Sequence, residues 1–307
     1  MKAVFITEHG GPEVLRYGDL PDPVAAPGEL LVDVHAASIN GADWKVRIGG
    51  NYGPLKFPHV LGRDFSGVVR GLGAGVGDFK VGDAVFAVCD TGQEGAYAER
   101  IAIKAAIAAP KPDNLSHAEA AAMALTGLTA LIGVEDTLKL KAGERILIQG
   151  GAGGVAAFAI QLAKHIGAEV VTTARQENHD YVRSLGADEI VDYTVEDIAR
   201  RGPFCDAAFD TVGGAATAQS FAVLKPGGRA AFIASGAKAP PAPRPDVQSL
   251  RPAVGRDRPH LLRIADLHEK GAVRPPEIRT YRLADAVAAH RVSEGRHFRG
   301  KLVFQVR

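Results

Sequence analysis

GERILIQGGAGGVAAFAIQLAK, residues 143–164, is the stretch that decides the fold of this chain. Residues 145–149 form an apolar run of strand length, and apolar residues recur at helical spacing from position 155 to 164. The glycines between them permit a tight turn that side chains would block. A second apolar run at 168–174 follows, so the pattern predicts a strand–turn–helix–strand unit.

The turn of this unit carries a phosphate-binding pattern. Gly151-x-Gly153-x-x-Ala156 matches the G-x-G-x-x-G/A fingerprint of dinucleotide-binding turns. A pyrophosphate must reach backbone N–H groups at a helix N-terminus, where the partial positive charge lies, and a Cβ on the near side would hold it away. Glycine-rich turns also occur for packing alone, so the motif by itself leaves both interpretations open.

The end of the second strand bears on the choice of cofactor. An NAD-binding protein usually places Asp or Glu there, on the ribose hydroxyls. Here residues 172–176 read Thr-Thr-Ala-Arg-Gln. A carboxylate would repel a 2′-phosphate, whereas the guanidinium of Arg175 can bind it with two hydrogen bonds, so we expect NADP(H). A solvated loop cation is the alternative for Arg175, and the nearby Glu177 weakens the argument.

The bulk composition limits the classes of protein. The 307 residues are enough for two domains, and 46% hydrophobic with 23% charged residues is ordinary globular composition. A net charge of +1 indicates no nucleic-acid-binding surface. Cys89 and Cys205 belong to no metal-binding or disulfide pattern, which favours a reducing cytoplasm. The N-terminus is too polar for a signal peptide and no run approaches ~18 apolar residues, so we expect no membrane span.

The order of expected elements divides the chain. Residues 1 to 120 read mostly as short strands, and Ser116-x-x-Glu119 forms a capping box before an alanine-rich helix that Gly127 interrupts or restarts. Strands and helices then alternate, which predicts an α/β protein with a parallel sheet. The expected strands are 146–149, 169–174, 189–192, 206–211 and 229–234, and the expected helices are 154–166, 179–185, 195–200 and 215–224. After a loop or poor edge strand at 239–259 we expect helices at 261–270 and 283–291 and a closing strand at 301–306.

Motifs along the whole chain resemble those of a known family. They include SINGADW at 38–44, GRDFSGVV at 62–69, SLGADEIVDYT at 184–194 and RGKLVF at 299–304. In this order and spacing they resemble the zinc-independent, zeta-crystallin-like quinone oxidoreductases of the medium-chain dehydrogenase/reductase superfamily. The resemblance implies a GroES-like, strand-rich catalytic domain (1–120 and 272–307) and a doubly wound Rossmann domain (121–271).

The resemblance also implies which residues hold NADP(H). The phosphate turn would use Gly150, Gly153, Gly154, Val155 and Ala156. The 2′-phosphate pocket would use Ala174, Arg175 and Tyr193. Two strand ends, Thr211-Val212 and Phe232-Ile233, would flank the adenosine and nicotinamide halves. Lys301 would reach the cofactor, although a plain surface lysine explains it equally well.

Three residues are candidates for the chemistry. Asn40 would lie against the nicotinamide and orient the oxygen of the hydride acceptor, or it would simply cap the following helix. Thr129 would approach the nicotinamide amide, or bond to its own helix. Tyr52 would stack on a quinone or donate a proton, or remain a surface tyrosine.

The family's zinc-dependent relatives carry metal ligands where this chain has Asp43 and Arg63-Asp64. Two carboxylates beside an arginine are a poor ligand set for zinc, so we expect no metal.

The implied reaction is hydride transfer from NADPH to a quinone. The alternatives are reduction of an α,β-unsaturated carbonyl compound and a low-turnover NADPH-binding role. The resemblance further implies a homodimer, although Pro245 and Pro252 would weaken the edge strand that pairs such dimers.

Overall fold

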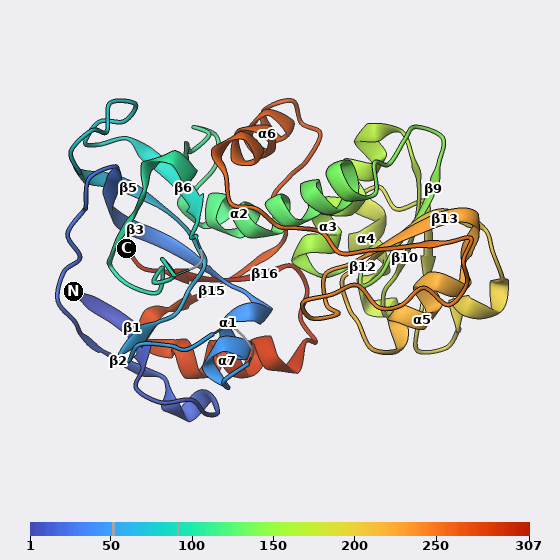
Figure 1. Cartoon of the computed structure of the whole chain (residues 1–307), viewed down its shortest axis with the longest axis horizontal. Coiled ribbons are helices and arrows are strands. Elements are labelled where there is room, and N and C mark those ends of the chain that lie inside the picture. The colour runs from blue at the N-terminus through green and yellow to red at the C-terminus, as the bar shows by residue number, and fades with distance from the viewer. Residues whose placement is uncertain (51–52, 91) are drawn as a thin grey trace. The chain divides into compact units, whose positions relative to one another are not determined.

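The chain folds into two compact units. The structure, a computed structural model, describes residues 1–50, 53–90 and 92–307 (Figure 1). The first unit consists of residues 1–125, 256–269 and 275–307, and the second of residues 126–255 and 270–274. The sequence placed the first boundary after residue 120 and assigned residues 256–269 to the dinucleotide-binding domain, so both boundaries differ from the expected ones.

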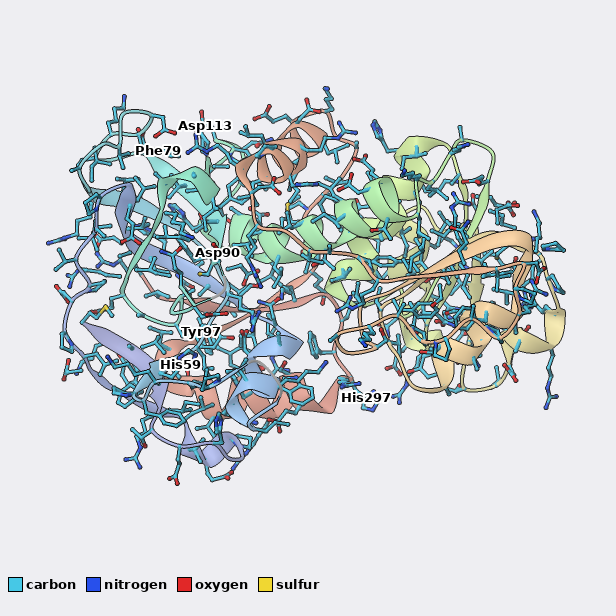
Figure 2. All side chains as sticks on the ribbon, viewed as in Figure 1. His59, Phe79, Asp90, Tyr97, Asp113 and His297 are labelled. Carbon is cyan, nitrogen blue, oxygen red and sulfur yellow. The ribbon has the colours of Figure 1, made fainter. Side chains whose placement is uncertain are left out.

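Helix α6 (Arg258–Glu269) explains the largest difference. Arg258, at its N-terminus, bonds to Asp78 Oδ2 at 2.5 Å and to the Ala105 carbonyl at 2.6 Å. Its guanidinium also lies 4.8 Å from the centre of the Phe79 ring, which Figure 2 labels. These partners lie more than 150 positions away in the sequence, so no local sequence pattern could predict that α6 belongs to the first unit.

The first unit is built mostly on antiparallel strands, and its one parallel pair among the described residues is β15 with β16. Its seven-stranded sheet runs in the order β15-β16-β3-β5-β6-β8, with β7 also paired to β3, and a three-stranded sheet has the order β2-β1-β4. The elements are β1 (Lys2–Ile6), β2 (Arg16–Asp19), β3 (Glu29–Ile39), α1 (Gly41–Arg47), β4 (His59–Val60), β5 (Asp64–Leu72), β6 (Ala84–Val88), β7 (Arg100–Lys104), β8 (Ala108–Pro110), α6, β15 (Ile278–Arg282), α7 (Ala286–Gly295) and β16 (Lys301–Gln305).

Strand register brings three chain segments to one end of this sheet. β16 runs antiparallel to β3 with Leu302 opposite Ile39, and β3 runs antiparallel to β5 with Ala37 opposite Phe65. The end of β3 therefore lies between the starts of β5 and β16. Asp64 and Lys301 are the first residues of those two strands.

The second unit contains a six-stranded parallel sheet, as predicted. The strand order is β11-β10-β9-β12-β13-β14, which is the doubly wound order of dinucleotide-binding folds. The elements are β9 (Arg145–Ile148), α3 (Gly154–Ile166), β10 (Glu169–Thr173), α4 (His179–Ser184), β11 (Glu189–Val191), β12 (Cys205–Asp210), α5 (Ala215–Ala222), β13 (Leu224–Phe232) and β14 (Gln248–Leu250). The order reverses between β9 and β12, so ligands of such sheets bind where β9 ends.

Two helix predictions need correction. Helix α2 (His117–Leu131) begins at the predicted capping box, with the Ser116 N–H bonded to Glu119 Oε2 at 2.8 Å, but it runs through Gly127 without a break. One glycine costs about 1 kcal/mol in a helix, which packing of a buried helix offsets. The expected helix at 195–200 is a short 3₁₀ helix, Ile198–Arg201.

One helical stretch is longer and more apolar than the sequence analysis expected. His117–Thr137 is long and apolar enough to cross a membrane by length and composition, but 78% of its most apolar window is buried inside the protein. Burial of this kind is typical of a core helix, so the stretch is weak evidence for a membrane span.

A buried histidine marks the core of the first unit. His290 on α7 is fully buried, and neither ring nitrogen has a hydrogen-bond partner among the described residues. Its ring meets the Tyr97 ring edge-on at 5.9 Å. Burial, and to a smaller extent the nearby Arg47, lowers the pKa of His290 to about 3. The folded protein therefore holds this imidazole neutral.

We predict that His290 weakens the protein in acid. Between pH 6.5 and about 3 the unfolded chain binds a proton that the folded protein does not, so stability falls as pH falls, by about 1.4 kcal/mol per pH unit. Urea unfolding of the wild type and His290→Leu at pH 7 and pH 4.5 measures this. The variant should lose about 2–3 kcal/mol less between the two pH values. Equal losses would show that His290 does not titrate in this way.

Candidate cofactor and hydride-transfer site

The glycine turn after β9 folds as the fingerprint predicts. Gly150 has φ +74°, a conformation that favours glycine, and its N–H donates to Thr173 Oγ1 at 3.0 Å. A Cβ at Gly151 would lie 2.4 Å from Thr172 Oγ1 and 2.7 Å from Val182 Cγ1. Both glycines are therefore required by the protein's own packing.

Gly153 differs from its neighbours because nothing in the protein crowds it. The nearest atom to a Cβ there would be the Gly150 carbonyl oxygen at 3.4 Å, and its φ of −79° suits any residue. Gly153 is the N-cap of the 13-residue helix α3 and makes no side-chain cap. The first N–H groups of a helix have no partner within it, so Gly154, Val155 and Ala156 present donors for an anion.

The predicted 2′-phosphate residues lie together at the end of β10. The Nε of Arg175 donates to the Tyr193 hydroxyl at 3.0 Å, and the Tyr193 side chain is 46% exposed. Among the described residues Tyr193 is the one hydrogen-bond partner of the Arg175 side chain. The four N–H groups on its outer nitrogens are thus available to a phosphate, and Glu177 does not pair with it. Ala174, before it, is buried.

The two other strand ends behave differently from each other. After β12, the buried Asp210 accepts from the N–H groups of Val212 and Gly213 at 2.9 and 2.8 Å, and Thr211 Oγ1 donates to the Gln149 carbonyl at 2.7 Å. These bonds fix the loop that carries Thr211 and Val212.

The end of β13 points its phenyl ring into the core. Phe232 is fully buried, and its ring packs 4.9 Å from the Phe221 ring. Its carbonyl accepts from Arg251 at 2.8 Å. The ring of Phe232 is therefore not available to a cofactor, whereas Ile233, next to it, is half-buried.

In the first unit, Asn40 is the centre of a buried hydrogen-bond network. Its Nδ2 donates to Asp64 Oδ1 at 2.8 Å and to the Ser38 carbonyl at 3.3 Å. Its Oδ1 accepts from Lys301 Nζ at 2.5 Å. Lys301 is 5% exposed and also donates to the Ile39 carbonyl at 2.7 Å, so it is not the surface lysine that the sequence allowed.

A second group of polar residues supports this network. Asn40 is the N-cap of α1, and its backbone N–H donates to Asp43 Oδ2 at 2.8 Å. The same oxygen accepts from the Tyr97 hydroxyl at 2.6 Å, and Arg63 Nε lies 3.7 Å from Asp43 Oδ1. Burial raises the pKa of Asp43 to about 6, although Arg63 and Tyr97 oppose the shift. Sequence reasoning gave no role to Ser38, although it begins the SINGADW motif, or to Tyr97, because their partners Asp64 and Asp43 lie 26 and 54 positions away in the chain.

The two carboxylates at the positions where zinc-dependent relatives bind metal both accept hydrogen bonds from other groups of this protein. Asp43 binds Tyr97 and the Asn40 N–H, and Asp64 accepts from the Ser38 hydroxyl at 2.7 Å and from the Leu125 N–H at 3.2 Å. Residues 1–50, 53–90 and 92–307 contain no group of three or more His, Cys, Asp or Glu side chains that could hold a metal ion. These residues do not fit a zinc site.

Thr129 and Tyr52 are the other two catalytic candidates. Thr129 lies on α2, is 8% exposed and belongs to the second compact unit. Tyr52 lies outside the described residues.

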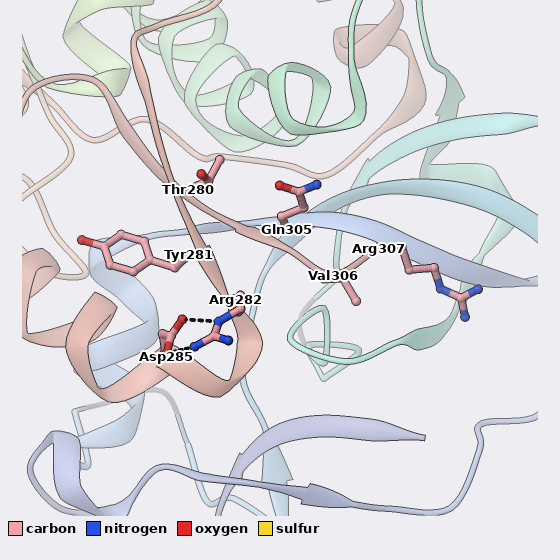
Figure 3. A pocket seen from close by; sticks show the side chains of 7 residues that line it. All are labelled: Thr280, Tyr281, Arg282, Asp285, Gln305, Val306 and Arg307. Carbon is pink, nitrogen blue, oxygen red and sulfur yellow. Dashed lines mark hydrogen bonds and ion pairs between the residues drawn. The ribbon is translucent and has the colours of Figure 1, made fainter.

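A surface pocket of the first unit lies apart from the predicted residues. Figure 3 shows its lining. Arg282 Nε bonds to Asp285 at 2.8 Å, and Arg307 Nη2 lies 3.1 Å from Asp33. Because both cations are paired, we assign no ligand to it. The lining residues are Thr280, Tyr281, Arg282, Asp285, Gln305, Val306 and Arg307.

Comparison with known proteins places the chain in a family. Residues 26–113 match the alcohol dehydrogenase GroES-like domain, and residues 185–304 match the zinc-binding dehydrogenase family. A quinone oxidoreductase of Pseudomonas aeruginosa is 32% identical over 98% of each chain. The structure of the quinone oxidoreductase from Coxiella burnetii is 35% identical, covers 100% of this chain and 99% of its own, and superposes with a TM-score of 0.93. The chain belongs to the zeta-crystallin-like quinone oxidoreductases of the medium-chain dehydrogenase/reductase superfamily.

Other proteins similar to this chain are named for different activities. An NADPH-dependent alkenal/one oxidoreductase of Arabidopsis thaliana is 36% identical over 90% of this chain and 71% of its own. A mitochondrial NAD(P)H oxidoreductase of Danio rerio is 36% identical over 76% of this chain, which spans 66% of that relative. The quinone oxidoreductase of Escherichia coli, solved with NADPH, is 27% identical over the full length of both chains, with a TM-score of 0.90. These relatives support NAD(P)H-dependent oxidoreduction and leave the acceptor open.

We predict that alanine substitutions at two glycines of the turn, Gly151 and Gly153, have different effects on stability. Gly151→Ala forces a Cβ against Thr172 and Val182, so it should destabilise the second unit by about 1–3 kcal/mol. Gly153→Ala meets no close protein atom, so it should cost about 1 kcal/mol or less.

The same pair separates folding from cofactor binding. Gly153→Ala should raise the dissociation constant of NADPH about tenfold, because its methyl group would hold the pyrophosphate off the helix N-terminus. Urea unfolding and fluorescence titration with NADPH measure the two effects. NADPH binding unchanged in folded Gly153→Ala would argue against a phosphate at this turn.

Proposed function

We propose that the protein is a metal-free oxidoreductase that uses NADPH to reduce a quinone. The observation that carries the proposal is the uncapped N-terminus of α3 behind Gly153, with Arg175 and Tyr193 bonded together at the end of the next strand. When bound there, NADPH would supply a hydride from its nicotinamide ring. The protein's part is to bind, orient and exclude water.

The preference for NADPH over NADH rests on Arg175. The end of β10 carries no carboxylate for a ribose 2′-hydroxyl, and Asp192 is already bonded to the N–H groups of Gln176 and Thr194. A guanidinium with unused donors beside a tyrosine ring suits a 2′-phosphate. The NADPH bound in the Escherichia coli relative supports the same choice.

A quinone is favoured because its reduction needs no strong acid from the protein. Hydride transfer to a quinone leaves a hydroquinone anion, which water can protonate. An enone instead becomes an enolate that must gain a proton on carbon. In the Asn40 network the candidate acids are buried and hydrogen-bonded within the protein. Tyr97 donates to Asp43, which is 1% exposed, and Lys301 donates to Asn40 and to the Ile39 carbonyl.

Enone reduction is the second candidate. The plant alkenal/one oxidoreductase, 36% identical over most of this chain, favours it.

We also propose that the protein is cytoplasmic and forms a homodimer. Both cysteines are buried free thiols, which suits a reducing compartment.

The acceptor can be tested by following NADPH oxidation by absorbance with a small quinone and, in parallel, with a simple enone. We expect faster oxidation with the quinone than with the enone. The same assays with NADH should be slow. Faster turnover of the enone would replace the quinone proposal with the second candidate. No oxidation with either acceptor, despite tight NADPH binding, would favour a low-turnover binding role.

We predict that Arg175→Ala separates the two cofactors. Loss of a charge-assisted contact of about 1.5–3 kcal/mol should raise the dissociation constant of NADPH roughly 10- to 100-fold. NADH binding should change less than about twofold, since NADH has no 2′-phosphate. Arg183→Ala is the matched control, because Arg183 is an exposed arginine on α4 of the same unit. An unchanged NADPH affinity in Arg175→Ala would show that another residue recognises the phosphate.

A further inference from the structure

We propose that Lys301 and Asp64 are positioning residues that lock the side-chain amide of Asn40, leaving it one free hydrogen-bond acceptor and no free donor. The inference rests on the proposed function and on the expectation, implied by the family resemblance, that Asn40 lies against the nicotinamide. The proposal differs from the role that the sequence analysis expected of Asn40, which was to orient the oxygen of the hydride acceptor.

The charges on either side of Asn40 dictate which way its amide faces. The Lys301 ammonium is a donor only and lies 2.5 Å from Oδ1. The Asp64 carboxylate lies 2.8 Å from Nδ2 and also receives the Ser38 hydroxyl and the Leu125 N–H. A flipped amide would set its NH₂ against the ammonium and its oxygen against the carboxylate. Neither reversed contact is a hydrogen bond, so the amide has one orientation.

Counting hydrogen-bond positions shows what is left for a ligand. Both hydrogens of Nδ2 are used, one by Asp64 and one by the Ser38 carbonyl at 3.3 Å. Oδ1 has two lone pairs, of which Lys301 occupies one. With respect to residues 1–50, 53–90 and 92–307, Asn40 can therefore accept one more hydrogen bond and donate none. It can bind an N–H or O–H group of the cofactor, but it cannot stabilise negative charge that develops on the oxygen of the acceptor.

Burial makes this arrangement a fixed one. Lys301 and Asp64 are 5% and 0% exposed, so water is a poor substitute for either partner. Burial lowers the pKa of Lys301, while the negative charges of Asp64 and Asp43 oppose that shift. The ammonium, amide and carboxylate together carry no net charge, which reduces the cost of placing two ions in the core.

The two roles of Asn40 predict different kinetics. A donor to a developing oxyanion contributes in the transition state, and its loss lowers kcat about 100- to 1000-fold. An acceptor for a cofactor donor contributes to binding, and its loss raises the dissociation constant of NADPH with kcat nearly intact. The donor on NADPH would be its carboxamide N–H or a hydroxyl of its nicotinamide ribose.

The test uses Asn40→Ala, Lys301→Met and the double variant. We expect each single variant to bind NADPH about tenfold more weakly, with kcat at saturating NADPH within about threefold of wild type. Binding of 2′-phospho-ADP, which lacks both the nicotinamide ring and its ribose, should be unchanged. The double variant should bind NADPH no more weakly than Asn40→Ala alone, because Lys301 acts through Asn40.

Controls keep the result interpretable. Lys104→Met removes a surface lysine that is ion-paired with Asp90 in the same unit, and it should bind both ligands as wild type does. If Lys301→Met fails to fold because it strands the Asp64 charge, Lys301→Met/Asp64→Asn removes both ions and frees the amide. That variant should show the same loss of NADPH affinity.

An analogue of NADPH distinguishes the two donors. In reduced 3-acetylpyridine adenine dinucleotide phosphate a methyl ketone replaces the carboxamide. If Asn40 accepts from the carboxamide, Asn40→Ala should not weaken binding of the analogue. If Asn40 accepts from the ribose hydroxyl, it should weaken the analogue about as much as NADPH.

Three outcomes would overturn the assignment. A 100-fold fall in kcat with unchanged NADPH affinity would make Asn40 a donor to the acceptor. Equal weakening of NADPH and 2′-phospho-ADP in Lys301→Met would make Lys301 merely structural. Wild-type protein that binds neither ligand would overturn the proposed function itself, and this is distinguishable because no variant is needed to see it.

Discussion

Two opposite charges buried at the end of one sheet constrain the first unit. Asp64 and Lys301 begin β5 and β16, on either side of the end of β3, and both are shielded from water. An unpaired buried charge costs several kcal/mol, so each needs partners that the fold must supply. Asn40 joins them, and its own N–H is held by Asp43, which in turn receives the Tyr97 hydroxyl. The start of α1 and the ends of three strands therefore depend on the same set of bonds.

In the second unit the main constraint is the steric space around a glycine turn, not the burial of charge. There the requirement is to bring backbone N–H groups to the surface without a side chain in front of them. Gly150 and Gly151 make the turn because of a positive φ and a close approach to Thr172, whereas Gly153 is left uncrowded at the N-cap of α3. Arg175, which follows the neighbouring strand, would add a positive charge to a phosphate site there. Sterics shape this site, and ion burial shapes the other.

Much of the fold could be predicted because it follows from short-range patterns. Helix α3 has the bounds 154–166 that its periodicity indicated, and Ser116 and Glu119 form the expected capping box. The predictions that failed depended on distant contacts. Gly127 does not break α2, because the buried helix is held by its surroundings. The assignment of α6 depended on Arg258 meeting Asp78 and Ala105, which no neighbouring residue reveals.

By itself the sequence determined the strand–glycine turn–helix unit, the parallel sheet and the family, because periodicity, backbone freedom at glycine and motif order are local properties. It also brought forward Asn40, Arg175 and Lys301 as functional candidates. Tertiary structure alone decided what those side chains do. Lys301 lies 261 positions from Asn40 in the chain, and Asp64 lies 24 positions away. Whether an amide donates or accepts is settled by the charges that surround it, and only folding brings those charges together.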